Sequence, residues 1–170
     1  MSNWLHVAAI IRIDAFEGFF EEDDFQVKET DRIKEVFGKE LRYDDNKAWK
    51  EYREHPERYL PAGSEGSLRM SLWTNPKNNY CDRYTLSIFG DLRGRFNCQS
   101  IIDWFKDRCS KMKRWTIRNA CITVTNEVST YASSTTEQCD GNELDADNSN
   151  IIWIDMNDER KQAYDNNQKM

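Results

Sequence analysis

Two hydrophobic periods follow one another along residues 1–125, and their order restricts the folds that the chain can adopt. Four segments alternate apolar and polar side chains with the period of two that is typical of β-strands. Two others repeat apolar side chains every three or four residues, as an amphipathic helix does, and they follow Thr30 and Asn97, which are favourable N-caps. The alternating segments are residues 4–14, 68–73, 84–89 and 117–125. The pattern predicts the order strand, helix, two strands, helix, strand.

This order is that of the ferredoxin-like sandwich, β-α-β-β-α-β, in which two helices cover one face of a four-stranded antiparallel sheet. We therefore predict an α+β domain of this class over residues 1–128. Segment 4–14 is largely apolar on both faces, which favours a central strand. The second helix keeps one apolar side, which we expect to cover the sheet. That side consists of Cys98, Ile101, Ile102, Phe105, Cys109 and Met112.

Charge is divided unevenly along the chain. Residues 1–125 carry 21 Lys and Arg against 20 Asp and Glu, a net +1, whereas residues 126–170 carry 3 against 10, a net −7. Together they make the −6 of the whole chain. An acidic polar tail suits a basic protein surface better than a nucleic-acid backbone. We therefore expect an acidic C-terminal extension on a nearly neutral body.

The composition divides this extension in two. Residues 129–150 are rich in Ser, Thr, Asp and Asn and are predicted to form a polar linker. Residues 151–170 contain an apolar island that includes Trp153. This island could dock on its own domain, as an edge strand or across the open sheet face. Alternatively it could dock on a partner protein or on a second copy of the chain.

The sheet face opposite the helices is the first candidate site. Aromatic and Arg side chains on such a face are what RNA-recognition modules use to stack bases. The segment TLSIFGDLRGRF, however, lacks the motif K/R-G-F/Y-G/A-F-V-x-F/Y of those modules. The alternative is that the C-terminal island or a dimer mate covers this face. Residues expected on it are His6, Ile10, Arg12, Arg69, Ser71, Trp73, Ser87, Phe89, Cys121 and Thr123.

A glycine-containing loop, GDLRGRF at residues 90–96, is a second candidate. It connects a predicted strand to a predicted helix, and Arg93 and Arg95 could hold an anion near the helix N-terminus. It matches neither a Walker A loop nor the GxGxxG fingerprint. The alternative is a connection in which glycine only provides backbone freedom.

Several chemistries find no support in the sequence. The five cysteines are spaced by 17, 11, 12 and 18 residues and include no CxxC pair, so we expect free thiols in a reducing cytoplasm and no metal site. No stretch approaches the 18 apolar residues of a membrane span. No nucleophile with an oriented base stands out around His6 or His55, so we expect neither an enzyme nor a cofactor.

Two functions therefore stay open, with a small enzyme ranked last. The first is a non-catalytic binding protein that captures or inhibits another protein, such as a basic surface that normally holds nucleic acid. In size, charge and organisation the chain resembles phage-encoded counter-defence proteins such as anti-CRISPR inhibitors, although no specific motif carries this resemblance. The second is an RNA- or nucleotide-binding module, and a homodimer is compatible with both. The expected binding residues are Arg12, Arg69, Trp73, Phe89, Arg93, Arg95 and Trp153.

Overall fold

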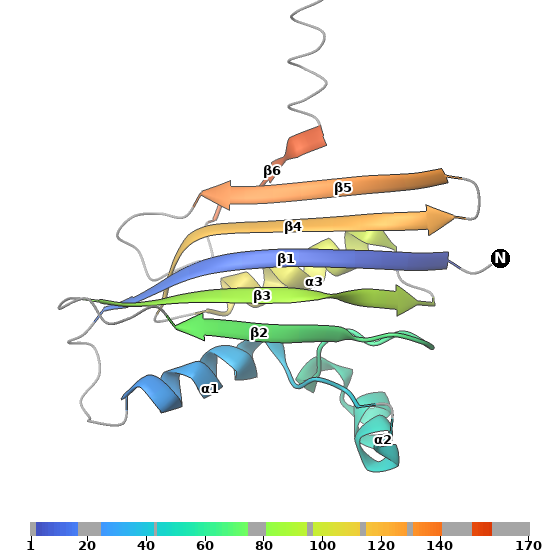
Figure 1. Cartoon of the computed structure of the whole chain (residues 1–170), viewed down its shortest axis with the longest axis horizontal. Helices are drawn as coiled ribbons and strands as arrows, with labels where there is room; N and C mark the ends of the chain where they lie inside the picture. The colour runs from blue at the N-terminus through green and yellow to red at the C-terminus, as the bar shows by residue number, and fades with distance from the viewer. Residues whose placement is uncertain are drawn as a thin grey trace, which may run out of the picture.

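A six-stranded antiparallel sheet with the strand order β2-β3-β1-β4-β5-β6 forms the centre of an α+β fold (Figure 1). The computed structural model describes residues 3–16, 25–42, 44–74, 81–94, 97–112, 115–128, 131–140 and 151–157. The strands are β1 (Asn3–Phe16), β2 (Leu68–Thr74), β3 (Cys81–Arg93), β4 (Thr116–Val128), β5 (Tyr131–Asp140) and β6 (Ile154–Asp155). The helices are α1 (Phe25–Phe37), α2 (Asn46–Glu54), α3 (Cys98–Ser110) and the short 3-10 helix η1 (Pro56–Arg58).

The sheet has two more strands than the four that the sequence predicts. Tyr131–Asp140, within the predicted linker, pairs with β4 from Val128↔Tyr131 to Asn119↔Asp140. Tyr and Thr are good strand formers, and pairing with β4 satisfies one backbone edge whatever the polarity of the side chains. Of the side chains of this segment that the structure describes, Glu137 and Cys139 are buried. The rest of the predicted linker, residues 129–130 and 141–150, lies outside the described residues.

The predicted acidic extension is described only as far as Asn157. Its residues Ile154–Asp155 form β6, which pairs antiparallel with Gln138 and Glu137 of β5. Residues 158–170, which belong to the same predicted segment, lie outside the described residues. The apolar island therefore contributes the last strand of the sheet.

The core lies between the sheet and α3, which passes behind the strands in Figure 1. Leu5, Val7, Ile11 and Ile13 project from β1 into this core and are almost fully buried. The α3 side chains that meet them are Ile101, Ile102, Phe105 and Cys109. The start of α3 is fixed by a capping box, because the Asn97 side chain accepts from the Ser100 backbone N–H and the Ser100 hydroxyl accepts from the Asn97 N–H. No described helix is long and apolar enough to cross a membrane.

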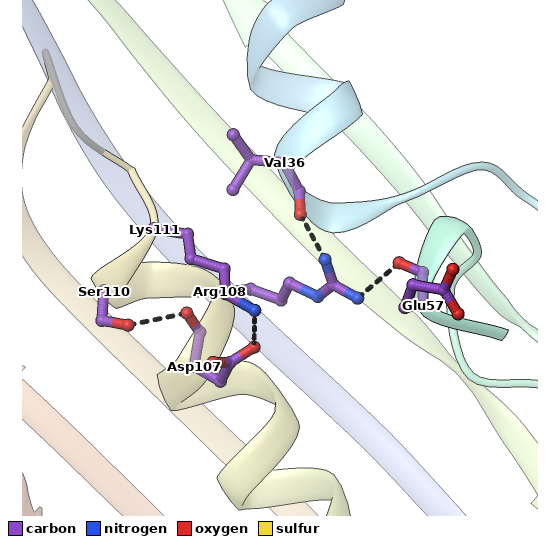
Figure 2. Close-up of polar contacts among 6 residues, drawn as sticks. All are labelled: Val36, Glu57, Asp107, Arg108, Ser110 and Lys111. Carbon is purple, nitrogen blue, oxygen red and sulfur yellow. Dashed lines mark hydrogen bonds and ion pairs between the residues drawn. The ribbon is translucent and has the colours of Figure 1, made fainter. Parts of the chain in front are cut away.

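Arg108 of α3 connects α1 and η1 to this core (Figure 2). Its guanidinium donates to the carbonyl of Val36 at the end of α1, over 3.1 Å, and to the carbonyl of Glu57 in η1, over 2.7 Å. The last carbonyls of a helix have no partner within it, so a cation is a favourable donor there. The Arg108 side chain therefore links α3, α1 and η1. Helices α1 and α2 lie towards the β2 edge of the sheet (Figure 1).

Candidate functional site

The sheet surface turned away from α3, here called the open face, carries rows of side chains from neighbouring strands. Residues paired across antiparallel strands point to the same face, so the strand register defines these rows. Along the strands, successive rows on β2, β3, β1 and β4 are Arg83-Asp14-Thr116, Trp73-Thr85-Arg12-Asn119, Ser71-Ser87-Ile10-Cys121, Arg69-Phe89-Ala8-Thr123, Asp91-His6-Thr125 and Arg93-Trp4-Glu127. The structure thus brings Arg12, Arg69, Trp73 and Phe89 together on one face.

Large apolar side chains are exposed along the middle of the open face. The exposed fraction is 66% for Trp73, 51% for Phe89 and 48% for Ile10. Phe89 lies directly across from Ala8 and diagonally from Ile10, while Trp73 lies two rows away. Ile154 of β6 is paired with Gln138 and extends the Ile10 row to the far edge with 40% exposure. These four exposed apolar side chains, here called the apolar strip, are spread from β2 to β6, with the polar Ser87 and Gln138 between them.

The two arginines at this strip differ in their surroundings. Arg69 is paired with Glu40, whose other oxygen accepts from the backbone N–H of Met70 over 2.8 Å. Its positive charge is therefore matched by a carboxylate that is itself anchored to β2. Arg12 is exposed in the Trp73 row. Arg12 is thus an exposed cation in this row.

The open face is polar at the opposite end of the strands, here called the polar end. There, side chains from three strands place His6 between two carboxylates. Nδ1 of His6 lies 2.7 Å from an oxygen of Asp91 in β3, and Nε2 lies 3.0 Å from an oxygen of Glu127 in β4. The hydrogen bond to Asp91, followed by that to Glu127, raises the pKa of His6 above 6.5. Sequence reasoning missed both partners. The alternation of β3 continues past Gly90, and following it would have placed Asp91 beside Phe89.

Arg93 lies at the same end and is not an anion site at the start of α3. Its guanidinium pairs with Glu65 and lies over the Trp4 ring, 5.9 Å from its centroid. The expectation of a loop from residue 90 is wrong, because β3 continues to Arg93, whose backbone N–H donates to the Glu65 carbonyl. The N-terminus of α3 is occupied by its own capping box. Arg95, the other predicted anion ligand, lies outside the described residues.

Trp153 packs on the helix side of the sheet, away from the open face. Its ring meets Phe105 of α3 edge to face with 5.7 Å between centroids, and Lys106 Nζ lies 5.7 Å from the Trp153 ring. Lys106 also pairs with buried Glu137 of β5. Because neighbouring residues alternate between faces, Trp153 is turned to the core while Ile154 is exposed on the open face. Trp153 is therefore an anchor within this chain.

The described side chains form no metal or nucleophilic centre. No group of three His, Cys, Asp or Glu among them could hold a metal ion. Burial raises the pKa of Cys98, Cys109 and Cys121, which keeps these thiols protonated and weakly nucleophilic. Two surface hollows of about 470 and 310 Å³ are lined by residues of 31–59 and Met70, outside the rows of the open face. Comparisons with protein-family models, curated proteins and solved structures found no match to this chain.

The His6 contacts predict a pH dependence. Replacing His55 with Gln leaves His6 as the one histidine of the chain, and we expect its imidazole to titrate above 6.5 by NMR. A raised pKa in the folded state means that the carboxylates stabilise the protonated imidazole. This stabilisation is complete below pH 6.5 and is lost as the pH rises through the folded-state pKa. Asp91→Asn should move the titration back towards 6.5, and a wild-type midpoint at or below 6.5 would contradict the contacts.

Proposed function

We propose that this chain is a non-catalytic binding module that docks another protein on its open face. The observation that carries the proposal is the apolar strip of Trp73, Phe89, Ile10 and Ile154, whose side chains are 40–66% exposed on one continuous sheet surface. Single exposed apolar residues are ordinary, whereas several large ones on one face are typical of an interaction site. Exposed aromatic residues are also those most often found as binding hot spots.

The charges beside the strip indicate the chemistry of the partner. Asp91 and Glu127 lie at the polar end, Glu65 lies next to it, and the whole chain carries a net −6. A partner that presents Lys or Arg beside an apolar patch would complement this arrangement. Carboxylates of this kind compete with phosphates for a basic groove, so capture or inhibition of a nucleic-acid-binding protein fits. The likeness to phage counter-defence and anti-CRISPR proteins is an analogy of size and charge.

The ferredoxin-like class remains part of the proposal. The order β2-β3-β1-β4 within the larger sheet, with α1 and α3 in the two crossovers, supports a ferredoxin-like unit. On this interpretation β5 and β6 are additions at the β4 edge. They widen the surface that a partner can contact.

RNA or nucleotide binding is the second candidate. The exposed rings of Trp73 and Phe89, with Arg12 in the Trp73 row, favour it because aromatic rings stack on bases. Against it, Asp91 and Glu127 lie on the same face and would repel phosphates, and Glu40 already neutralises Arg69. Protein docking therefore has the stronger support.

The test compares a variant that loses two apolar side chains of the strip with a variant that loses one exposed isoleucine elsewhere. The double variant Ile10→Ser with Phe89→Ser should reduce capture of a protein partner from source-cell extract by about 30-fold, since a hot spot contributes about 2 kcal/mol. Ile152→Ser removes an exposed isoleucine outside the strip and should leave capture unchanged.

Direct titration of labelled single-stranded RNA separates the two candidates. We expect no binding at micromolar concentrations. Binding that Trp73→Ser and Phe89→Ser abolish would instead establish the second function. Capture that is equal for the double variant and for Ile152→Ser would exclude the open face as the docking surface.

A further inference from the structure

We infer that the outer edge of β2 binds an extended peptide segment of another protein, which is added to the sheet as a further strand with α1 behind it. This inference concerns the edge of the sheet and does not depend on docking at the open face. It follows from the backbone groups at this edge, from the oxygens that already occupy two of them, and from the position of α1.

Two hydrogen bonds identify the backbone groups of β2 that point away from the sheet. Among the described strands β2 is paired only with β3, so every second N–H and C=O of β2 points outward. The N–H of Leu68 donates to the Pro61 carbonyl over 3.1 Å, and the N–H of Met70 donates to the Glu40 carboxylate over 2.8 Å. Both acceptors lie outside the sheet, so Leu68 and Met70 are outward positions.

The second half of the same edge is open. Since outward groups recur at every second residue, the N–H groups of Leu72 and Thr74 point outward together with those of Leu68 and Met70. At Leu68 and Met70 an oxygen already stands where the carbonyl of a neighbouring strand would be. The N–H groups of Leu72 and Thr74 have no such partner among the described residues. An extended peptide presents N–H and C=O groups at the spacing of a strand and can pair with both positions at once.

Helix α1 lies where it would support such a peptide from behind. Its buried residues belong to the same core as those of α3, so α1 lies in the layer behind the sheet. In Figure 1 it lies next to β2, on the outer side of this edge strand. Asp31, Lys34 and Glu35 of α1 are exposed and, with Met70, line the hollow of about 470 Å³. The helix layer therefore reaches further than the strands here, and an added strand would cover it.

The surroundings of the edge define the side chains of the peptide. A strand paired antiparallel with residues 70–74 would alternate its side chains between the helix side and the open face. Those on the helix side would lie over the hollow, whose carboxylates and ammonium groups favour long or small polar side chains. On the open face one side chain would lie across from Trp73, which is 66% exposed, and a β-branched residue packs well on an aromatic ring there. The occupant is therefore an extended segment that alternates polar with β-branched residues.

Hydrogen exchange of the full chain, followed residue by residue by NMR, tests whether the edge is open. The amides of Leu72 and Thr74 should exchange at least about 100-fold faster than that of Ser71, which points to β3. Protection of both amides in a dilute sample would overturn the inference, because the edge would already be covered. Protection that appears only as the protein concentration rises would overturn it in favour of pairing between two copies of the chain.

The peptide acetyl-KVTTQ-amide is the probe for the occupant. In the antiparallel register its Val lies across from Trp73, and its first, third and fifth residues turn their N–H groups towards β2. At about 5 mM it should slow exchange of the Leu72 and Thr74 amides about tenfold, the effect of a ligand present at about ten times its Kd. N-methylation of the third and fifth residues should abolish this slowing, because it removes donors that face β2. N-methylation of the second and fourth residues is the matched control and should preserve it.

A substitution at the end of β2 tests the same contact from the side of the protein. Thr74→Pro removes an outward N–H and leaves the pairing of β2 with β3 intact, as proline on an edge strand does. It should weaken peptide binding at least about threefold, the loss of one of the few main-chain hydrogen bonds. Thr74→Val keeps the N–H and should bind as the wild type does, and circular dichroism checks that both variants are folded.

The outcomes separate this inference from the proposed function. If the unmodified peptide has no effect at about 5 mM, or if the two N-methylated peptides behave alike, the edge does not bind an added strand. Ile10→Ser with Phe89→Ser changes β1 and β3 and should leave the effect of the peptide unchanged. If the peptide fails while capture of a partner still depends on Ile10 and Phe89, docking at the open face stands alone. If the peptide binds as expected and no partner is captured, the edge site stands and the proposed function fails.

Discussion

Replacing Phe105 with Ala is expected to lower the free energy of unfolding by about 3–5 kcal/mol, the usual cost of removing a buried aromatic ring. Phe105 is fully buried, and its ring meets Phe37 of α1 and Trp153 of the C-terminal segment with centroids 6.4 and 5.7 Å apart. The substitution would leave a cavity where three elements meet. Urea unfolding followed by circular dichroism measures the loss.

Phe89→Ala is the matched control, because it removes the same side chain from the opposite side of the sheet. Phe89 is half exposed on the open face, so its loss should cost no more than about 1 kcal/mol. Equal losses for the two variants would mean that the sheet does not bury one face and leave the other open. Phe105→Ala should also shift the tryptophan fluorescence of the chain to longer wavelength, since the Trp153 indole loses the ring that it contacts.

Gly90→Ala is expected to cost about 3 kcal/mol or more, because both the backbone and its surroundings exclude a side chain there. Gly90 has φ +149°, and a Cβ on it would lie 2.6 Å from the carbonyl oxygen of Ser67. Gly90 pairs with Leu68 in β2, so the two backbones meet where no side chain fits. The strain would reach Phe89 and Asp91, which lie on either side of Gly90 and belong to the open face.

Gly94→Ala is the control for the backbone contribution. Gly94 has the same φ of +149°, but among the described residues the atom nearest to a Cβ on it would be Ser64 N, at 3.6 Å. We expect a loss of about 1 kcal/mol, the lower end of the cost of a strained backbone conformation. Thermal unfolding of both variants measures the difference. If Gly94→Ala were as damaging as Gly90→Ala, the close approach of Ser67 to β3 would not exist in solution.

Much of the core could be predicted from local periods. The alternation at 4–14 correctly separates Leu5, Val7, Ile11 and Ile13, which are buried, from Ile10 and Arg12, which are exposed. The repeat after Asn97 likewise identifies the buried side of α3. These predictions succeed because a strand or helix places side chains by geometry that depends only on neighbours in the chain.

The candidate site could be predicted only in part. Arg12, Arg69, Trp73 and Phe89 share a face because each lies on a strand whose alternation is visible. His6 meets Asp91 and Glu127 across 85 and 121 residues, and no local pattern connects them. Trp153 was expected to dock somewhere, but its contact with Phe105 depends on where β6 joins the sheet.

The amino-acid sequence alone determines which side chains lie on the same side of each strand and helix, since that follows from the period of the backbone. Only the tertiary structure decides that Tyr131–Asp140 is a strand, that β3 runs on to Arg93, and which charges meet at the end of the open face. Strand pairing is made by backbone groups that every residue carries, so the register between distant segments leaves little trace in side-chain composition. It is settled by the packing of the whole sheet on α3.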